Sequence, residues 1–361
     1  MDHFRIYESH NLQHIIRFME ANNLLKIIFK PCRFPSRHPD ARRPPRDGPL
    51  LQAIQVVCAP LLLSLNEHLL HDHFGFPDSQ QFVYSRPRDS PIFGGPHGLD
   101  VNLAALLHFL NFWKYHMVRE VEQTLFAAFN HLHPDERPQW WDSKLQQDAQ
   151  TMGRHWKGSF AYIDDDELVD VRGWNESDKE TAVIQDKFEG ENDAFEFGDL
   201  QLEMIPKNKM KWPEAFERHL HSLTPSPPAS PSGVRTRAQK RGGGGGTPED
   251  LTGLEPQPFR FEGGGEGDDA FHATGWAQPL PKQQGIPGWQ RLTMMKYFVN
   301  DQSELWAYEG VVLPGGKIIV GRWWNPLRSD EEAYSGPFIF WCVDGAAGYE
   351  CRFQDGEEHE D

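Results

Sequence analysis

Apolar residues recur with helical spacing through the first 150 positions of the chain. Hydrophobic positions three and four residues apart indicate an amphipathic helix over about 12–25 and a second over about 50–71, bent at Pro60. The clearest helix is expected to begin at Asp100, a good N-cap residue, and to run to His131. Its apolar stripe consists of Leu103, Leu106, Leu107, Leu110, Trp113, Met117, Val121, Leu125 and Phe129. Such a stripe is typical of a helix packed on a core, so residues 1–153 are predicted to form a helical region.

From residue 154 the pattern changes to short aromatic runs with alternating polarity, separated by glycine and proline turns. The tight turn at Pro314-Gly315-Gly316 between two β-prone runs predicts a hairpin. The candidate strands cover residues 156–163, 198–205, 259–262, 270–276, 289–299, 305–313, 317–324 and 336–343. Eight strands are enough to close a small barrel. The predicted fold class is therefore α+β, with an eight-stranded antiparallel β-barrel over residues 154–345 behind the helical region.

Polar segments interrupt and follow the predicted barrel. Residues 164–199 carry fourteen acidic residues against three basic ones, which predicts a solvated excursion. Residues 224–258 are rich in Pro, Ser and Gly and predict a disordered insertion. Residues 346–361 form an acidic tail, expected to be frayed. None of these segments has the apolar periodicity of a core element.

Composition limits which classes of partner and which cell compartment we expect for this protein. The net charge of −17 argues against nucleic acid or an anionic membrane as the main partner, because phosphate binding needs a basic face. The most apolar stretch, 50–65, is too short and polar to span a bilayer. The four cysteines form no C-x-x-C pair, and the first residues lack signal-peptide features. We therefore expect a cytoplasmic protein without a membrane span, and the basic run 235–241 leaves the nucleus open.

Glycines and aromatic residues in the second half follow a spacing known from other barrels. The motifs are Trp156-x-Gly158, Phe261-x-Gly263-x-Gly265, Lys296-Tyr297, Tyr308-x-Gly310, Gly321-x-Trp323 and Gly336-x-Phe338. This pattern resembles that of lipocalin-like (calycin) barrels. Over about residues 154–344 the chain resembles more closely a group of uncharacterised proteins from filamentous fungi, which carry comparable Trp-Ala-Tyr-Glu-Gly, Leu-Pro-Gly-Gly and Gly-Arg-Trp-Trp segments. The resemblance implies a fold and no particular activity, because barrels host many functions.

Alternation along the strands defines the candidate ligand-binding residues. They are Trp276, Lys296, Trp306, Tyr308, Glu309, Arg322 and Trp324. Alternate residues of a barrel strand point inward, but aromatic residues occupy both faces here, so the sequence leaves the inward face open. If Glu309 and Arg322 point inward, they are expected to pair in a dry cavity and grip a polar ligand group. If they point outward, they are ordinary surface charges. Lys296 has the same two alternatives.

Motifs for catalysis or metal binding are weak. The run Gly263-Gly264-Gly265-Glu266-Gly267 lacks a following lysine and helix, so a turn between strands is expected rather than a phosphate loop. His68, His71 and His73 have a spacing compatible with a metal site, but solvent-facing histidines are the simpler interpretation. His272, in the barrel region, is a candidate general base or a structural histidine. We predict no cofactor, no metal and no catalytic residue.

Three functional hypotheses remain open. The first is a non-enzymatic binding protein that holds a small apolar or aromatic ligand in the barrel, or a protein partner on its surface. The second is a scaffold or regulatory adaptor that uses the helical region and Ser-Pro sites in the insertion. The third is an isomerase or cyclase that works in the barrel cavity, with Lys296, His272, Glu309 or Arg322 as polar groups. The sequence favours the first and leaves open both enzymatic activity and oligomeric state.

Overall fold

The computed structural model describes residues 21, 48–65, 74–95, 98–141, 144–145, 152–175, 177–178, 184–188, 197–205, 259–265, 271–298, 305–328, 334–347 and 349. Apart from residue 21, which is helical, the predicted helix over 12–25 lies outside these residues, as do the histidines at 68, 71 and 73 and the insertion 224–258. The helical elements are α3 (Pro49–Val57), α4 (Ala59–Leu62), α5 (Phe76–Tyr84), α6 (Leu103–Val118), α7 (Phe126–His131), the 3-10 helix η3 (Pro134–Glu136) and α8 (Asp165–Gly173). The strands are β1 (Phe93–Gly94), β2 (Asp100–Val101), β3 (His155–Tyr162), β4 (Lys187–Phe188), β5 (Gly198–Ile205), β6 (Phe259–Gly265), β7 (Phe271–Pro279), β8 (Gln290–Phe298), β9 (Leu305–Val312), β10 (Ile318–Trp324) and β11 (Ser335–Cys342).

Eight strands form a closed antiparallel barrel. The strands β5 to β11 follow one another in chain order, and β3 pairs with both β5 and β11. The closing register places Phe338 opposite Phe160 and Cys342 opposite Trp156. The short strand β4 extends β3 outside this cylinder. The predicted eight-stranded antiparallel barrel is therefore confirmed, and helices accompany it.

Aromatic rings of the inner face pack over glycines on neighbouring strands. Gly310 and Gly321 are direct cross-strand neighbours, and both face the ring of Phe338. A Cβ atom at either position would lie 2.8 Å from an atom of that ring. Aromatic packing over a glycine keeps curved sheets filled. The glycine spacing in the sequence thus reflects space needed inside the barrel.

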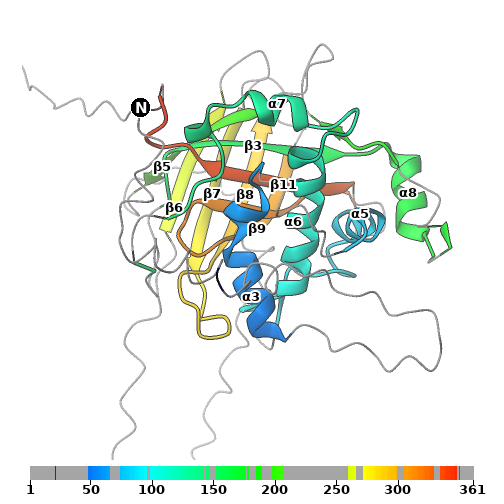
Figure 1. Cartoon of the computed structure of the whole chain (residues 1–361), viewed down its shortest axis with the longest axis horizontal. Coiled ribbons are helices and arrows are strands. Elements are labelled where there is room, and N and C mark those ends of the chain that lie inside the picture. Colours follow the sequence, from blue (N-terminus) through cyan, green and yellow to red (C-terminus); the bar gives the residue numbers. More distant parts are fainter. Residues whose placement is uncertain are drawn as a thin grey trace, which may run out of the picture.

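Helices cover one side of the barrel (Figure 1). Outward-facing residues of the covered strands, such as Val311, Val320 and Ile339, belong to the same buried cluster as Leu106 and Phe109 of α6. A second cluster, with Trp156 and Phe261 among its members, fills the barrel interior. The barrel wall is therefore apolar on both faces where helices cover it, which explains why aromatic residues occupy both parities of the strands.

The predicted helix over 100–131 is wrong at its start and in its continuity. Asp100 belongs to β2, and Asn102 is the N-cap of α6, where its side chain accepts a hydrogen bond from the Ala105 amide at 3.2 Å. After α6 the chain leaves the helical conformation, and Gln123 has a φ of 58°. A positive φ interrupts an α-helix, so α7 is a separate element. In the segment over 50–71, the break between α3 and α4 falls at Cys58, before Pro60, and residues 66–71 lie outside the described ranges.

The described residues of the acidic segment, 164–175, 177–178, 184–188 and 197–199, include regular and buried structure that the prediction of a solvated excursion did not foresee. Three acidic residues lie in the first turn of α8, where they favour the helix dipole. Asp186 is 2% exposed and accepts hydrogen bonds from the Tyr84 hydroxyl at 2.6 Å and the Gln80 amide at 2.7 Å. Its carboxylate also lies 3.0 Å from Nε2 of His116. The segment 184–188 is thus fastened to α5 and α6 rather than solvated.

Two further predictions need correction. The glycines at 263, 264 and 265 belong to β6 rather than to a turn, while residues 266 and 267 lie outside the described ranges. At the start of the acidic tail, Ala346 is buried and the Tyr349 hydroxyl donates a hydrogen bond to Asp199 at 3.0 Å. The glycine run is compatible with a strand because neighbouring strands approach it closely.

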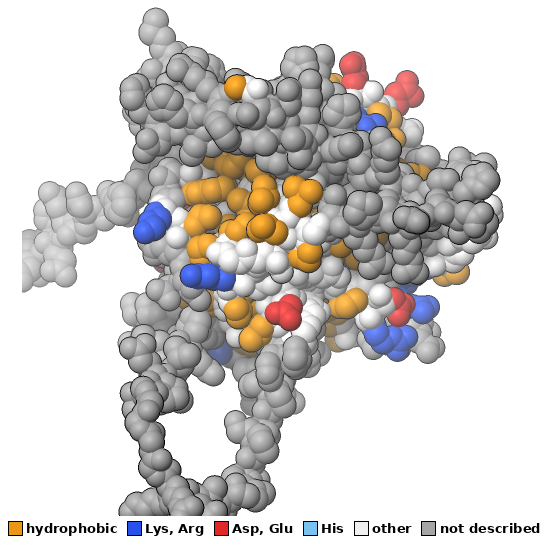
Figure 2. Space-filling view, turned by 60° about the horizontal axis from the view of Figure 1, so that its bottom comes forward, with side chains coloured by type: hydrophobic (Ala, Val, Ile, Leu, Met, Phe, Trp, Pro, Cys, Tyr) orange, Lys and Arg blue, Asp and Glu red, His pale blue; other side chains and the backbone are white. Residues whose placement is uncertain are grey.

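The surface of the described residues has both apolar and charged parts. Figure 2 shows a face on which hydrophobic side chains gather, with basic and acidic side chains near the border. The large hydrophobic residues with the highest exposure in the described ranges are Leu50, Val121, Val169, Met204 and Leu327. Single exposed apolar residues of this kind are common in folded proteins. Within the described ranges, no helix combines the length and apolarity that crossing a membrane requires.

Candidate functional site

The seven predicted site residues divide between the two faces of the barrel wall. Cross-strand pairs share a face, and Lys296 pairs with Trp306, which belongs to the interior cluster together with Tyr308. These three residues therefore point inward. The remaining four point outward: Trp276, Glu309, Arg322 and Trp324. The structure does not bring all seven into one site: Glu309, Arg322 and Trp324 line one pocket on the outer face, and Trp276 does not line it.

Lys296 lies among phenylalanine rings inside the barrel. Its Nζ atom is 4.3 Å from the ring centroid of Phe271, 4.9 Å from that of Phe298 and 5.0 Å from that of Phe160. Phe160 belongs to β3, across the interior from β7 and β8. Cation–π contacts of this length are favourable. We call five residues the inner aromatic cluster: these three phenylalanines, Trp306, which is the cross-strand partner of Lys296, and Tyr162, whose ring centroid lies 6.5 Å from that of Phe160.

Solvent reaches the inner aromatic cluster. All five of its aromatic side chains have intermediate exposure, although they point into a closed barrel. Elsewhere in the interior, Trp156, Phe261 and Phe338 are fully buried. Tyr308 belongs to that filled part, with its ring centroid 5.1 Å from that of Phe338. The interior therefore has a filled layer and a layer with partly exposed rings.

On the outer face, Arg322 fastens the barrel to the end of α5. Its side chain donates hydrogen bonds to the carbonyl oxygens of Phe82 at 3.1 Å, Val83 at 3.2 Å and Ser90 at 3.1 Å. Arg172 donates to the next carbonyl, that of Tyr84, at 2.9 Å. The last carbonyls of a helix lack partners within the helix and attract cations. The two arginines supply partners for the carbonyls of Val83 and Tyr84 and a second partner for that of Phe82, which also accepts from the Ser85 amide at 3.2 Å.

Burial changes the acid–base properties of these arginines. The pKa of Arg322 is lowered to about 9, first because burial penalises its charge; Glu309 acts in the opposite direction. The pKa of Arg172 is lowered to about 10, again mainly by burial, and Arg86 adds like-charge repulsion. Both groups stay protonated at neutral pH because these values lie above 7.

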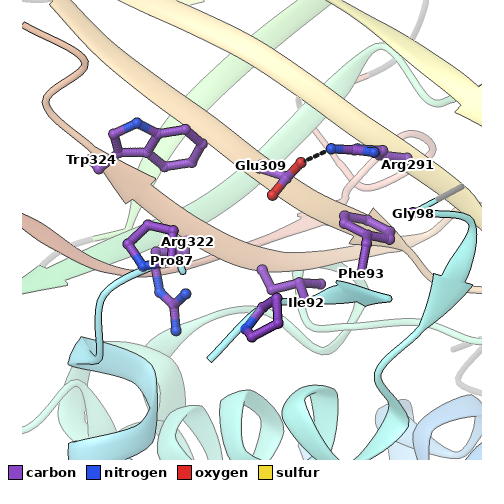
Figure 3. A pocket seen from close by; sticks show the side chains of 9 residues that line it. Pro87, Ile92, Phe93, Gly98, Arg291, Glu309, Arg322 and Trp324 are labelled. Carbon is purple, nitrogen blue, oxygen red and sulfur yellow. Dashed lines mark hydrogen bonds and ion pairs between the residues drawn. The ribbon is translucent and has the colours of Figure 1, made fainter. Parts of the chain in front are cut away.

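Glu309 does not form the predicted internal pair with Arg322. It points outward and forms a short ion pair with Arg291 of β8, while Arg322, its direct cross-strand neighbour, turns to the carbonyls of α5 (Figure 3). Neither residue is an ordinary surface charge: Arg322 is 1% exposed, and the Glu309 side chain is 17% exposed. Both residues point outward, as one of the two alternatives had it, but they are not surface charges, because the polypeptide before α6 covers this part of the outer face.

A pocket of about 200 Å³ lies at this junction. Its lining consists of Pro87, Pro91, Ile92, Phe93, Gly98, Arg291, Glu309, Arg322 and Trp324. We call it the junction pocket, because the first five residues come from the segment before α6 and the last four from the barrel (Figure 3). The guanidinium carbon of Arg291 also lies 4.6 Å from the Phe93 ring centroid. Charged groups and flat apolar surfaces thus meet in one space.

Trp276 belongs to neither site. It is 5% exposed and lies in a small outer cluster with Met295, Leu305 and Ala307, against which Trp324 and Tyr297 pack. Trp324 therefore connects this cluster with the junction pocket. His272 lies on β7 of the barrel, as predicted, and is exposed on the outer face, with its ring centroid 5.3 Å from that of Tyr297, so it does not face the barrel interior.

Several residues of both sites were missed from the sequence. Phe160, Phe271 and Phe298 share the parity of Lys296, and this alternation would have identified them once Lys296 was placed inward. Arg291 had a weaker signal, as a cation on β8 two residues along the strand from Thr293, the cross-strand partner of Glu309. The pocket residues before α6 had no signal, because their contact with the barrel depends on tertiary packing.

No protein-family model, curated protein or solved structure matches this chain. The closed barrel is established by its strand pairing, and the resemblance to lipocalin-like and fungal proteins stays a prediction.

Proposed function

We propose that the chain is a non-enzymatic binding protein whose barrel holds a small apolar or aromatic ligand against the inner aromatic cluster. The observation that carries this proposal is the partial exposure of five inward-facing aromatic side chains in a closed barrel. In a fully packed interior such rings are buried, as Trp156 and Phe338 are. An apolar ligand that covers such water-exposed rings lowers the free energy, because it removes apolar surface from water.

The composition of the cluster defines the ligand class. Phenylalanine, tyrosine and tryptophan side chains offer flat apolar surfaces on more than one wall of the barrel. Ligand sites are commonly apolar, with few polar groups that set orientation. Lys296 is such a group, and its position over three rings favours a ligand whose polar end accepts a hydrogen bond. A ligand in this place agrees with the lipocalin-like barrel predicted from the glycine and aromatic spacing.

The proposal is tested by titrating the full chain with N-phenyl-1-naphthylamine, a neutral apolar probe that becomes fluorescent in apolar sites. Phe298 and Tyr297 form a matched pair, because they are adjacent on β8, both partly exposed, and point to opposite faces. Loss of one ring contact is worth about 1 kcal/mol, or about fivefold in Kd. Phe298→Leu is therefore expected to weaken binding about fivefold, and Tyr297→Leu by less than twofold. Equal effects of both variants, or no saturable binding, would contradict an interior ligand.

A further inference from the structure

The junction pocket is a second site, separated from the inner aromatic cluster by the barrel wall. Glu309 and Arg322 face outward, whereas Trp306 and Tyr308 on the same sheet face inward. Its volume of about 200 Å³ exceeds that of a cavity that holds benzene, about 150 Å³. The pocket therefore has room for one six-membered ring with a small substituent, and not for a large lipid.

The lining carries an excess positive charge. Arg291 and Glu309 form an ion pair and balance each other. Arg322 has five N–H donors, and three of them donate to backbone carbonyls. Those three acceptors are neutral, so the pocket contains one guanidinium charge more than carboxylate charge. One N–H on each terminal nitrogen of Arg322 has no protein acceptor among the described residues.

Burial makes this excess charge a favourable partner for an anion. The Arg322 guanidinium is hydrogen-bonded to neutral carbonyls instead of water, and burial lowers its pKa to about 9. Asp89 also acts on Arg322, but this carboxylate is exposed and lies 3.7 Å from Arg88 and 4.0 Å from Arg86. A charge-assisted hydrogen bond in a partly dehydrated site is stronger than one between neutral groups.

The remaining walls are flat and apolar. Trp324 lies on one side of the pocket, Phe93 and Ile92 lie on the facing segment, and the proline rings of 87 and 91 complete the lining (Figure 3). From this arrangement we propose that the junction pocket binds a small planar aromatic carboxylate, about the size of benzoate. The carboxylate contacts Arg322, and the ring lies against Trp324 and the prolines.

The test measures the Kd of benzoate, and of its neutral analogue benzamide, for the full chain by isothermal titration calorimetry. Benzoate is expected to bind at least tenfold more tightly than benzamide. Trp324→Leu is expected to weaken benzoate binding at least fivefold. Glu309→Gln removes the repelling carboxylate and leaves Arg291 without that partner, so benzoate is expected to bind at least threefold more tightly. Glu203→Gln, on the exposed outer face of β5, is the matched control and is expected to change Kd by less than twofold.

Whether Glu309→Gln strengthens or weakens benzoate binding shows whether the junction pocket favours an anion. Weaker benzoate binding in this variant, or equal affinity for benzoate and benzamide, would overturn the proposal, as would no binding at 10 mM benzoate. Phe298→Leu separates the two sites: benzoate affinity unchanged in this variant supports the junction pocket, and a fivefold loss would assign benzoate to the barrel interior and overturn it. None of these outcomes depends on a variant of Arg322, whose removal is expected to lower stability because three hydrogen bonds are lost.

Discussion

Lys296 and Arg322 are both buried cations of the barrel, 5% and 1% exposed, but they lie on opposite faces of its wall. Lys296 contacts the faces of three phenylalanine rings. Arg322 donates to three backbone carbonyls, two of them at the end of α5. Loss of the ring contacts removes no hydrogen bond from the backbone, whereas loss of Arg322 removes its hydrogen bond from the buried Val83 carbonyl. The Phe82 carbonyl keeps the Ser85 amide as a donor. The inner cation therefore makes its cation–π contacts with aromatic side chains, whereas the outer cation connects the barrel to the backbone of α5 and of the segment after it.

The largest effect is expected from the outer cation. Arg322→Met removes three hydrogen bonds and leaves their carbonyl acceptors in a buried site. The free energy of unfolding should fall by roughly 3–5 kcal/mol. Urea denaturation followed by circular dichroism measures the change. A loss below 1 kcal/mol would show that the junction does not depend on this arginine.

A smaller effect is expected from filling the inner face. Gly310→Ala places a methyl group 2.8 Å from the ring of Phe338 and 2.7 Å from the Val320 carbonyl oxygen. Overpacking of a core costs about 2 kcal/mol. The control is Gly173→Ala at the end of α8, where the added methyl group meets no atom within 4 Å. If both variants unfold at the same urea concentration, the inner layer around Phe338 is not tightly filled.

The inner cation should matter less for stability than the outer one. Lys296→Met keeps most of the side-chain volume and loses the cation–π contacts, so we expect a destabilisation of about 1 kcal/mol. The same urea experiment applies, with Arg322→Met measured in parallel. An equal loss for both variants would remove the distinction between the two faces.

The smallest effect is expected from an exposed cation near the same barrel edge. Arg328 lies 3.3 Å from Asp165, and both side chains are well exposed. Exposed ion pairs contribute little because water and salt screen them. Arg328→Met should lower the free energy of unfolding by less than about 0.5 kcal/mol. A loss comparable to that of Arg322→Met would mean that burial does not govern the contribution of these arginines.

The sequence predicted where the strands lie. It did not predict which side chains of each strand point into the barrel. Period-two alternation and the turn at 314–316 identified the eight strands, because these signals are local. Trp306 and Trp324 have the same local character, yet one points inward and the other outward. Packed helices bury part of the outer face, so hydrophobicity alone cannot assign the parity. The predicted site therefore combined residues from both faces.

In the helical region, too, the sequence predicted the element with a strong local pattern and missed those that depend on tertiary contacts. The apolar stripe after residue 102 identified α6, but α5 and the segment lining the junction pocket have weaker patterns and were missed. Asp186 lies in a segment whose charge predicts solvent exposure, and only tertiary hydrogen bonds from Gln80 and Tyr84 explain its burial. Contacts between residues a hundred positions apart leave no periodic signal in the chain.

The most direct test of two separate sites is a competition experiment. The full chain is titrated with N-phenyl-1-naphthylamine in the absence of benzoate and in saturating benzoate. If the interior and the junction pocket are independent, the Kd of the probe changes by less than twofold. Displacement of the probe, with an apparent Kd that rises in proportion to benzoate concentration, would show a single shared site and contradict the account.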